Sequence, residues 1–299
     1  MNLRHNLHLL AQYCQSVPLR LIWLVAARLP SRRASSFGAA LLGALGPLSR
    51  KHRHVRRNLS FVLPDAPEEE IEGVARQVWR NFGSVLAEYP HLESITAERC
   101  DIRVPAEVQE LFDQGRPALF VSGHVGNWEI VPSFLATKCR GLLVVYSPDP
   151  NPFVEASLQR RRQYPGVTFV DKDEALRQML VAAQDGSSLG LLPDQRVDSG
   201  TLLPLFDVEA PTTISPARIA ERVGYPLIPL HVERLPDGRF TVDFHPPLLP
   251  RPGLKGKEAA IDVTRQFYTL LEGWISNRPG QWLCTKRRWP KHAAPRARR

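Results

Sequence analysis

The sequence predicts an α/β fold in which a mainly parallel sheet is flanked by helices. Short apolar runs alternate along the chain with segments whose apolar residues recur every three or four positions, a pattern typical of strands connected by helices. With 299 residues and 43% hydrophobic content, the chain can build a substantial core. We see no internal repeat or linker, so we expect a single domain over residues 1–299, with 1–48 as an N-terminal membrane-associated helical extension.

The elements follow in order. A helix is predicted from Glu68 to Tyr89, because Ile71, Val74 and Val78 share one face and a proline follows its end. Residues 98–117 form a short, turn-rich stretch. The predicted strands are 118–123, 142–147, 167–170, 188–194 and 226–235. The predicted helices are 152–163, 174–184 and 215–224, together with a closing helix that carries Ile261, Thr264, Tyr268, Leu271 and Ile275 on one face. A turn at 236–238 predicts a hairpin at the sheet edge.

The net charge of +9 favours an anionic partner, such as lipid headgroups, an acidic protein or nucleic acid. Two basic clusters, at 50–57 and 286–299, are the candidate contact surfaces. The alternative is an ordinary solvated surface, which we prefer for the last ten residues. Four cysteines without a CxxC pair suggest a reducing compartment, and no metal or cofactor is expected.

The N-terminal stretch 7–30 is apolar but is interrupted by Pro18, Arg20 and Arg28. Its longest unbroken run has seven residues, against about 20 needed to cross a bilayer. We therefore expect a helix at a membrane surface, and not a spanning helix or a signal peptide. Residues 37–57 repeat this apolar-then-basic pattern, although both segments are also compatible with ordinary core helices.

The candidate chemistry lies in "PALFVSGHVGNWEIVPSFLA", residues 117–136, where His124 and Glu129 interrupt two apolar segments. Ligands of open α/β sheets bind beyond the carboxyl ends of strands, and His124 follows a predicted strand. Gly123 and Gly126 permit tight turns, and a helix expected to start at Asn127 would present free N–H groups. Histidine is suited to general-base catalysis near neutral pH, and Glu129 is expected to fix its tautomer. The alternative is a hydrogen-bonded core histidine.

Two other catalytic motifs are excluded. Ser122 has Phe120 two positions before it, so the Gly-x-Ser-x-Gly motif of serine hydrolases fails. The His-Glu-x-x-His motif of zinc proteases is also absent.

Five stretches together resemble the bacterial lipid A late acyltransferases, within the wider group of lysophospholipid and glycerolipid acyltransferases. The similarity lies in the order and spacing of "RRNLSFVLPD" (56–65), "GHVGNWE" (123–129), "LLPDQ" (191–195), "LLPLFDVEAPTTISPARIA" (202–220) and "RPGQWLCTKRRW" (278–289). The second stretch matches the family's His-x4-Asp/Glu motif.

This resemblance implies a glycerol-3-phosphate acyltransferase-like fold and an enzyme at the cytoplasmic face of the inner membrane. Such enzymes transfer a fatty acyl chain from acyl carrier protein to a hydroxyl of a membrane glycolipid. The resemblance implies His124 as base and Glu129 as its orienting group, with no acyl-enzyme. It also implies Gly126, Asn127, Arg162, Asp194 and Gln195 as substrate contacts, although Asp194 and Gln195 are also compatible with a cap or turn.

The chain departs from the family pattern at several positions. Ser147 stands where an arginine is usual, so Arg162 is the substitute candidate for an oxyanion or headgroup contact; backbone N–H groups near Gly126 are the alternative. Leu205, Phe206 and Asp207 replace Phe-Phe-Gly, and Cys284 and Lys286 replace Trp and His. These departures point to a divergent acceptor.

Three other functions remain open at this stage. The donor in an acyltransferase could be acyl-CoA with a lysophospholipid acceptor, or the acceptor could be water, which would make the enzyme a thioesterase. The chain could also be a non-enzymatic binder of anionic membranes or nucleic acid. No nucleic-acid-binding module is recognisable, so we expect no nucleic-acid partner.

Overall fold

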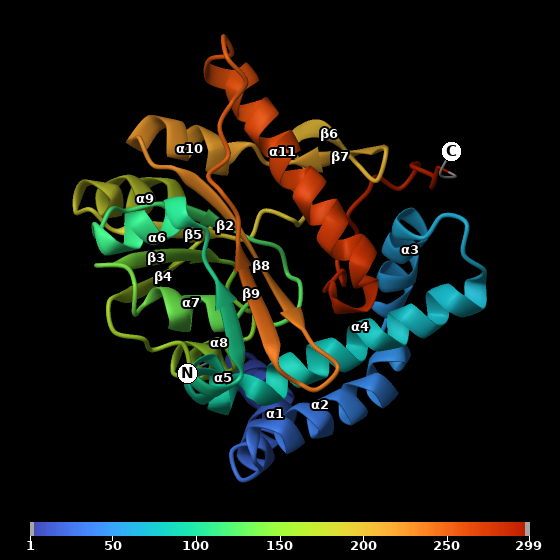
Figure 1. Cartoon of the computed structure of the whole chain (residues 1–299). Helices are drawn as coiled ribbons and strands as arrows, with labels where there is room; N and C mark the ends of the chain where they lie inside the picture. Colours follow the sequence, from blue (N-terminus) through green and yellow to red (C-terminus); the bar gives the residue numbers. More distant parts are fainter. Residues whose placement is uncertain (1–2, 297–299) are drawn as a thin grey trace.

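The computed structural model of the chain describes residues 3–296 and is built around a seven-stranded sheet (Figure 1). The strand order is β1-β9-β8-β2-β5-β3-β4, and neighbouring strands are parallel except for the antiparallel pair β8 and β9. The predicted α/β fold with a mainly parallel sheet is confirmed. The strands are β1 Cys100–Arg103, β2 Leu119–Val121, β3 Leu142–Tyr146, β4 Val167–Asp171, β5 Ser188–Leu191, β8 Leu227–Arg234 and β9 Phe240–Phe244.

Helices cover both faces of the sheet, and each face has its own core. Leu119 and Val121 pack into one core and Phe120, between them, into the other, as the alternation of side chains along a strand requires. The first core includes residues of α9 Ala175–Gln184, α10 Ser215–Val223 and α11 Gly256–Asn277. The second includes residues of α5 Leu92–Glu98, α6 Ala106–Asp113 and α7 Ile130–Leu135. Helix α8, Pro152–Gln159, lies against the N-terminal helix.

Four N-terminal helices form a layer beside the sheet (Figure 1). They are α1 Leu3–Ala26, α2 Ser31–Leu45, α3 His52–Val62 and α4 Glu68–Glu88. Helices α2 and α4 approach closely at Gly38 and Gly83, because a Cβ on Gly38 would lie 2.1 Å from the Gly83 carbonyl oxygen. Helix α2 therefore packs against α4 as an ordinary core helix would, which is the alternative noted for residues 37–57.

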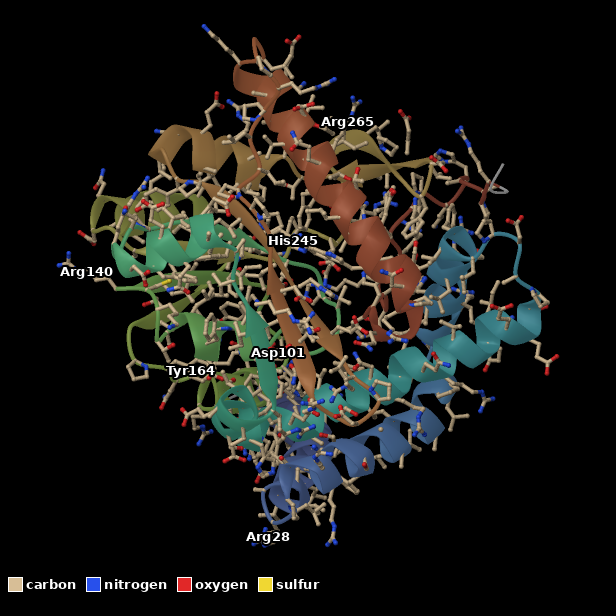
Figure 2. All side chains as sticks on the ribbon, viewed as in Figure 1. Arg28, Asp101, Arg140, Tyr164, His245 and Arg265 are labelled. Atoms are coloured by element: carbon tan, nitrogen blue, oxygen red, sulfur yellow. The ribbon has the colours of Figure 1, made fainter. Side chains whose placement is uncertain are left out.

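Helix α1 corrects the expectation that Pro18 interrupts the N-terminal stretch. Pro18 lies inside a continuous helix of 24 residues and does not end it, since a proline removes only its own N–H from the helical hydrogen bonds. Within the described residues, His5–Ala26 is the one helix long and apolar enough, by length and composition, to cross a membrane. Only 17% of the most apolar 18-residue stretch of this helix is buried, and Leu7 and Leu21 are exposed. Arg28, just after α1, projects away from the body of the protein (Figure 2).

Two local expectations were wrong, and one element was not predicted. Residues 98–117, expected to be turn-rich, contain β1 and α6. Because β1 pairs in parallel with β9, the predicted hairpin of β8 and β9 does not form the sheet edge. A second, unpredicted hairpin is formed by β6 Thr201–Leu205 and β7 Val208–Thr212.

The turn of this second hairpin places two non-glycine residues at positive φ. Phe206 and Asp207 have φ values of 51° and 58°, as a two-residue turn of this twist requires. Such conformations cost an L residue about 1–2 kcal/mol, less for aspartate.

Replacing Asp207 by glycine is expected to raise the free energy of unfolding by roughly 0.5–1 kcal/mol, because glycine adopts positive φ without a steric cost. Urea denaturation followed by circular dichroism measures the change. The matched control, Asp207→Ala, removes the carboxylate but keeps Cβ, so it is expected to give no gain. A glycine variant no more stable than the wild type would contradict this account of the turn.

Candidate active site

His124 and Asp194 meet at the carboxyl ends of two neighbouring strands. Val121 of β2 lies opposite Leu191 of β5 in parallel register, and each strand is followed three residues later by one of the two polar side chains. The Nδ1 atom of His124 lies 2.6 Å from Oδ1 of Asp194, and the His124 backbone N–H donates to Oδ2 at 3.2 Å. The prediction that Asp194 shares the crevice of His124 therefore matches this geometry.

Asp194 is an ionised carboxylate in a buried position. Its side chain is 1% exposed, and burial alone would raise its pKa. The charge of His124, with hydrogen bonds from His124 and from Nε1 of Trp282 at 3.1 Å, outweighs that effect and holds the pKa of Asp194 below its usual range. A carboxylate on Nδ1 fixes the imidazole tautomer that leaves Nε2 free to accept a proton.

Glu129 does not make the contact expected of it. Its carboxylate receives Nε of Arg162 at 3.0 Å on Oε2, and Nη2 of Arg162 at 2.6 Å and Nε1 of Trp128 at 2.9 Å on Oε1. The group that orients His124 is Asp194, and this corrects the expected pairing. Glu129 is linked to His124 only through Trp128, whose ring lies edge-on to the imidazole at 5.0 Å.

Arg162 lies in an aromatic enclosure beside Glu129. Its guanidinium lies 5.4 Å from the Phe169 ring and 5.7 Å from the Tyr146 ring, and Nη2 donates to the Tyr89 hydroxyl at 3.1 Å. Burial lowers the pKa of Arg162, but the neighbouring Glu129 carboxylate outweighs this effect and raises it. Burial likewise raises the pKa of Glu129, but the Arg162 charge outweighs it and lowers that pKa. The pair remains ionised. Among residues 3–296, Nη1 of Arg162 has no hydrogen-bond partner.

Gly126 and Asn127 support the loop from within the protein. A Cβ on Gly126 would lie 2.0 Å from the Val232 carbonyl oxygen, and the Gly126 N–H donates to the Gln281 carbonyl at 3.1 Å. Asn127 is fully buried and donates to Glu88 at 2.7 Å. Both residues therefore have structural contacts within the protein, and their expected role as substrate contacts stays a prediction.

Several of the expected backbone donors already have acceptors within the protein. Helix α7 begins at Ile130 and not at Asn127, and the Glu129 N–H donates to the Asn127 side chain at 3.1 Å. The N–H groups of His124 and Gly126 already have acceptors in the protein. Arg162, the side-chain donor considered from the sequence, has an unused N–H group at Nη1.

The C-terminal stretch 278–289 holds the histidine loop in place, which sequence reasoning did not anticipate. The Leu283 N–H donates to the His124 carbonyl at 2.8 Å. The buried Asn58 side chain donates to the carbonyls of Cys284 at 2.8 Å and Lys286 at 2.7 Å. The motif stretches noted in the sequence, 56–65, 123–129, 191–195 and 278–289, therefore meet in one place.

Gln195 completes the surroundings of His124. Its Nε2 lies 3.4 Å from Nε2 of His124, on the side of the ring away from Asp194.

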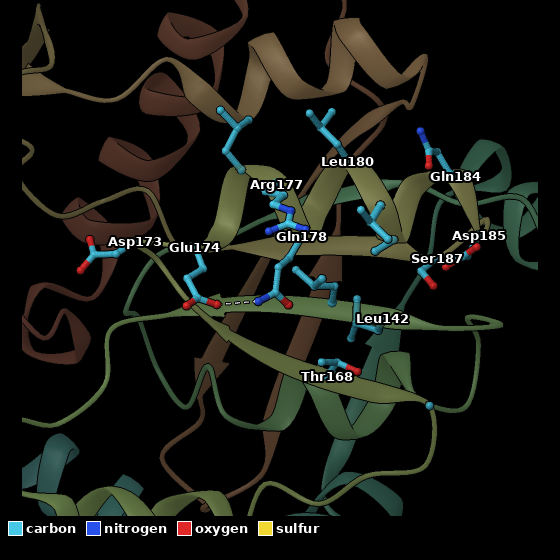
Figure 3. A pocket seen from close by; sticks show the side chains of 15 residues that line it. Leu142, Thr168, Asp173, Glu174, Arg177, Gln178, Leu180, Gln184, Asp185 and Ser187 are labelled. Atoms are coloured by element: carbon cyan, nitrogen blue, oxygen red, sulfur yellow. Dashed lines mark hydrogen bonds between the residues drawn. The ribbon is translucent and has the colours of Figure 1, made fainter.

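A groove of about 1120 Å³ lies elsewhere, between α9 and the starts of β3 and β4 (Figure 3). Leu142, Thr168 and Leu180 line it, and none of the predicted site residues does. The hydrogen-bonded pair His124 and Asp194 lies outside this groove.

The profile of the bacterial lipid A biosynthesis acyltransferases matches residues 4–291. The chain belongs to this family. No curated protein sequence matches it. Membership makes the protein an acyltransferase of lipid A biosynthesis, for which a lipid is the acceptor. The match also includes α1 from residue 4 onward.

In this acyltransferase, replacing Glu129 by glutamine is expected to destabilise the fold at pH 7 by about 3 kcal/mol, because the buried Arg162 charge loses its partner. Because folding lowers the pKa of Glu129, its contribution to the free energy of unfolding is fully present above the unfolded-state pKa of about 4.3. That contribution is lost as the pH falls through the folded-state pKa. The deficit of the variant should therefore shrink below about pH 4.

Urea unfolding at pH 7 and at acidic pH tests this expectation. The control is Glu98→Gln, since Glu98 is exposed at the end of α5. A Glu129→Gln deficit that stays constant across the acidic range would show that the ion pair is not its source.

Proposed function

We propose that the protein is a membrane-associated O-acyltransferase that moves a fatty acyl chain from acyl carrier protein to a hydroxyl of a glycolipid such as a lipid A precursor. The observation that carries this proposal is the buried Asp194 on Nδ1 of His124, with Nε2 left on the side of Gln195. A histidine held in this way is suited to take a proton from an alcohol.

In the proposed reaction the acceptor hydroxyl attacks the thioester carbonyl while Nε2 of His124 takes its proton. The new carbon–oxygen bond gives a tetrahedral oxyanion, and Asp194 stabilises the imidazolium. When the carbon–sulfur bond breaks, the thiolate leaves and takes the proton back from His124. Atoms and charge balance without an acyl-enzyme.

Arg162 is the proposed donor to the oxyanion. Its Nη1 is unused, and Glu129 holds the guanidinium by two hydrogen bonds, which fixes its direction before substrate binds. Glu129 then acts on the reaction through Arg162 and Trp128. Replacing it affects both stability and rate.

The proposed location is the cytoplasmic face of the inner membrane. Support comes from the exposed apolar residues along α1, from Arg28 after its end and from the basic cluster at 50–57. These features suit an anionic membrane surface.

Replacing His124 by alanine is expected to lower kcat by at least about 10²–10⁴ without unfolding the protein, since a positioned base contributes a factor of this size. The assay measures acyl transfer from acyl carrier protein to a hydroxylated glycolipid in detergent. The control is His292→Ala, because His292 is exposed in the C-terminal segment. Full activity in the His124→Ala variant would contradict the proposed mechanism.

The same assay distinguishes the alternatives. A preference for acyl-CoA would reassign the donor, and release of free fatty acid without glycolipid product would indicate a thioesterase. Binding of anionic vesicles without turnover of any thioester would leave only a membrane-binding function.

A further inference from the structure

Helix α1 reaches the surroundings of Arg162 through one fully buried tryptophan. Trp23 is 0% exposed, and its ring lies 4.1 Å from the guanidinium of Arg161, the residue just before Arg162. The centroid of the same ring lies 5.6 Å from that of the Tyr89 ring, and the Tyr89 hydroxyl accepts a hydrogen bond from Nη2 of Arg162 at 3.1 Å. Trp23 is therefore linked to Arg162 by two routes, one along the chain and one through Tyr89.

Trp23 itself is held firmly by the body of the protein. Its Nε1 donates to the Leu86 carbonyl of α4 at 2.7 Å. Close by, Nε2 of His91 lies 2.9 Å from the Ala26 carbonyl oxygen at the end of α1. Tryptophan has the ring that attracts a cation most strongly, so Arg161 is stabilised over its face. The indole is thus a fixed surface against which the segment before Arg162 packs.

The helix that leads to Arg162 also contacts α1 at its other end. Asn151 caps α8 by accepting from the Phe153 N–H at 3.0 Å, and its Nδ2 donates to the Gln12 carbonyl of α1 at 2.7 Å. The rings of Phe153 and Tyr13 meet edge-on at 5.4 Å. Helix α1 therefore supports α8 from its start to the turn just after it, where Arg162 lies.

The position of Arg162 matters because an oxyanion donor must be aligned before the reaction begins. Glu129 binds Nε and Nη2 of the guanidinium, so the direction of the free Nη1 depends on where the rest of the side chain is placed. An error of about 1 Å in such a position can cost about 10² in rate. Contacts that fix the backbone beside Arg162 and the Tyr89 hydroxyl therefore act on the rate.

We propose that Trp23 is a positioning residue for Arg162 and that α1 is the support on which this arginine is aligned. The role rests on the proposed function, in which Arg162 stabilises the oxyanion. One face of α1, with Trp23 and Ala26, is buried against the body, whereas Leu7 and Leu21 are exposed. The helix thus serves the reaction with one face and leaves the other free for lipid.

Replacing Trp23 by leucine is expected to lower kcat about tenfold, which is less than the factor of about 10²–10³ for loss of an oxyanion donor, because Arg162 stays paired with Glu129. KM is expected to stay near the wild-type value, since Trp23 does not touch the substrate. Trp23→Phe keeps an aromatic ring beside Arg161 and Tyr89, and it is expected to restore most of kcat. Acyl transfer in detergent measures both constants without a contribution from membrane binding.

The matched control is Trp79→Leu, the same change at a tryptophan of α4 that is 5% exposed. Trp79 packs in the core on the other face of the sheet and donates to His52 at 3.1 Å. Urea unfolding is expected to show a loss of stability in both leucine variants, but only Trp23→Leu should lose kcat. An equal loss of kcat in the two variants, or a change in KM alone, would overturn the positioning role of Trp23.

Arg161→Met tests the same contact without opening the core, and so serves even if Trp23→Leu does not fold. Methionine keeps a long apolar side chain but removes the cation from the face of the Trp23 ring. A kcat about threefold lower with unchanged KM is expected, since the cation–π contact is lost and the route through Tyr89 remains. Full kcat in Arg161→Met would contradict the route along the chain.

A signal of Arg162 itself separates this role from the proposed function. The Nε–H resonance of Arg162, identified by its absence in Arg162→Lys, is expected to shift in Trp23→Leu and to stay in place in Trp79→Leu. Such a shift in a protein that transfers no acyl group would keep the coupling of α1 to Arg162 and reject the function. An active protein in which Trp23→Leu leaves this resonance or kcat unchanged would reject the positioning role alone.

Discussion

The hydrogen bond between Asp194 and His124 is the interaction on which the site depends. A carboxylate that is 1% exposed is stable as an anion only if hydrogen-bond donors replace the water it has lost. Its donors come from the loop after β2 and from Trp282 near the C-terminus. One buried charge thus fixes three segments that are far apart in the sequence, and the position of the imidazole follows from satisfying that charge.

The same requirement explains why both ends of the chain belong to the site. Asn58, 1% exposed on α3, donates to two carbonyls of the C-terminal stretch and accepts from the Arg288 N–H at 3.1 Å. The buried Arg288 side chain in turn donates to the Pro211 carbonyl at 2.9 Å and to Thr212 at 2.6 Å. Loss of these contacts would release the segment that supports His124. One of the N-terminal helices, α3, therefore holds the segment that supports His124.

The sequence was sufficient to predict the alternation of strands and helices and the position of a histidine at a strand end, because both depend on local residue patterns. It was insufficient for the partner of that histidine. The side chain that meets His124 depends on β5 lying beside β2, and strand order is a property of the whole sheet. Strand β1 was missed because it has only four residues. The second hairpin was missed because Pro204 and Pro211 argue against a strand, although an isolated two-stranded ribbon tolerates them.

The spacing between His124 and Glu129 does not bring these two side chains together in this fold. Five positions apart on an irregular turn, the two side chains point to different partners, and Trp128 between them contacts both. Two hydrogen-bonded pairs, His124 with Asp194 and Arg162 with Glu129, are thereby connected through one indole ring. A base and a cationic donor need such a fixed relation, because a transition state develops charge at two atoms at once. The five-residue spacing thus directs His124 to Asp194 and Glu129 to Arg162, with Trp128 in contact with both His124 and Glu129.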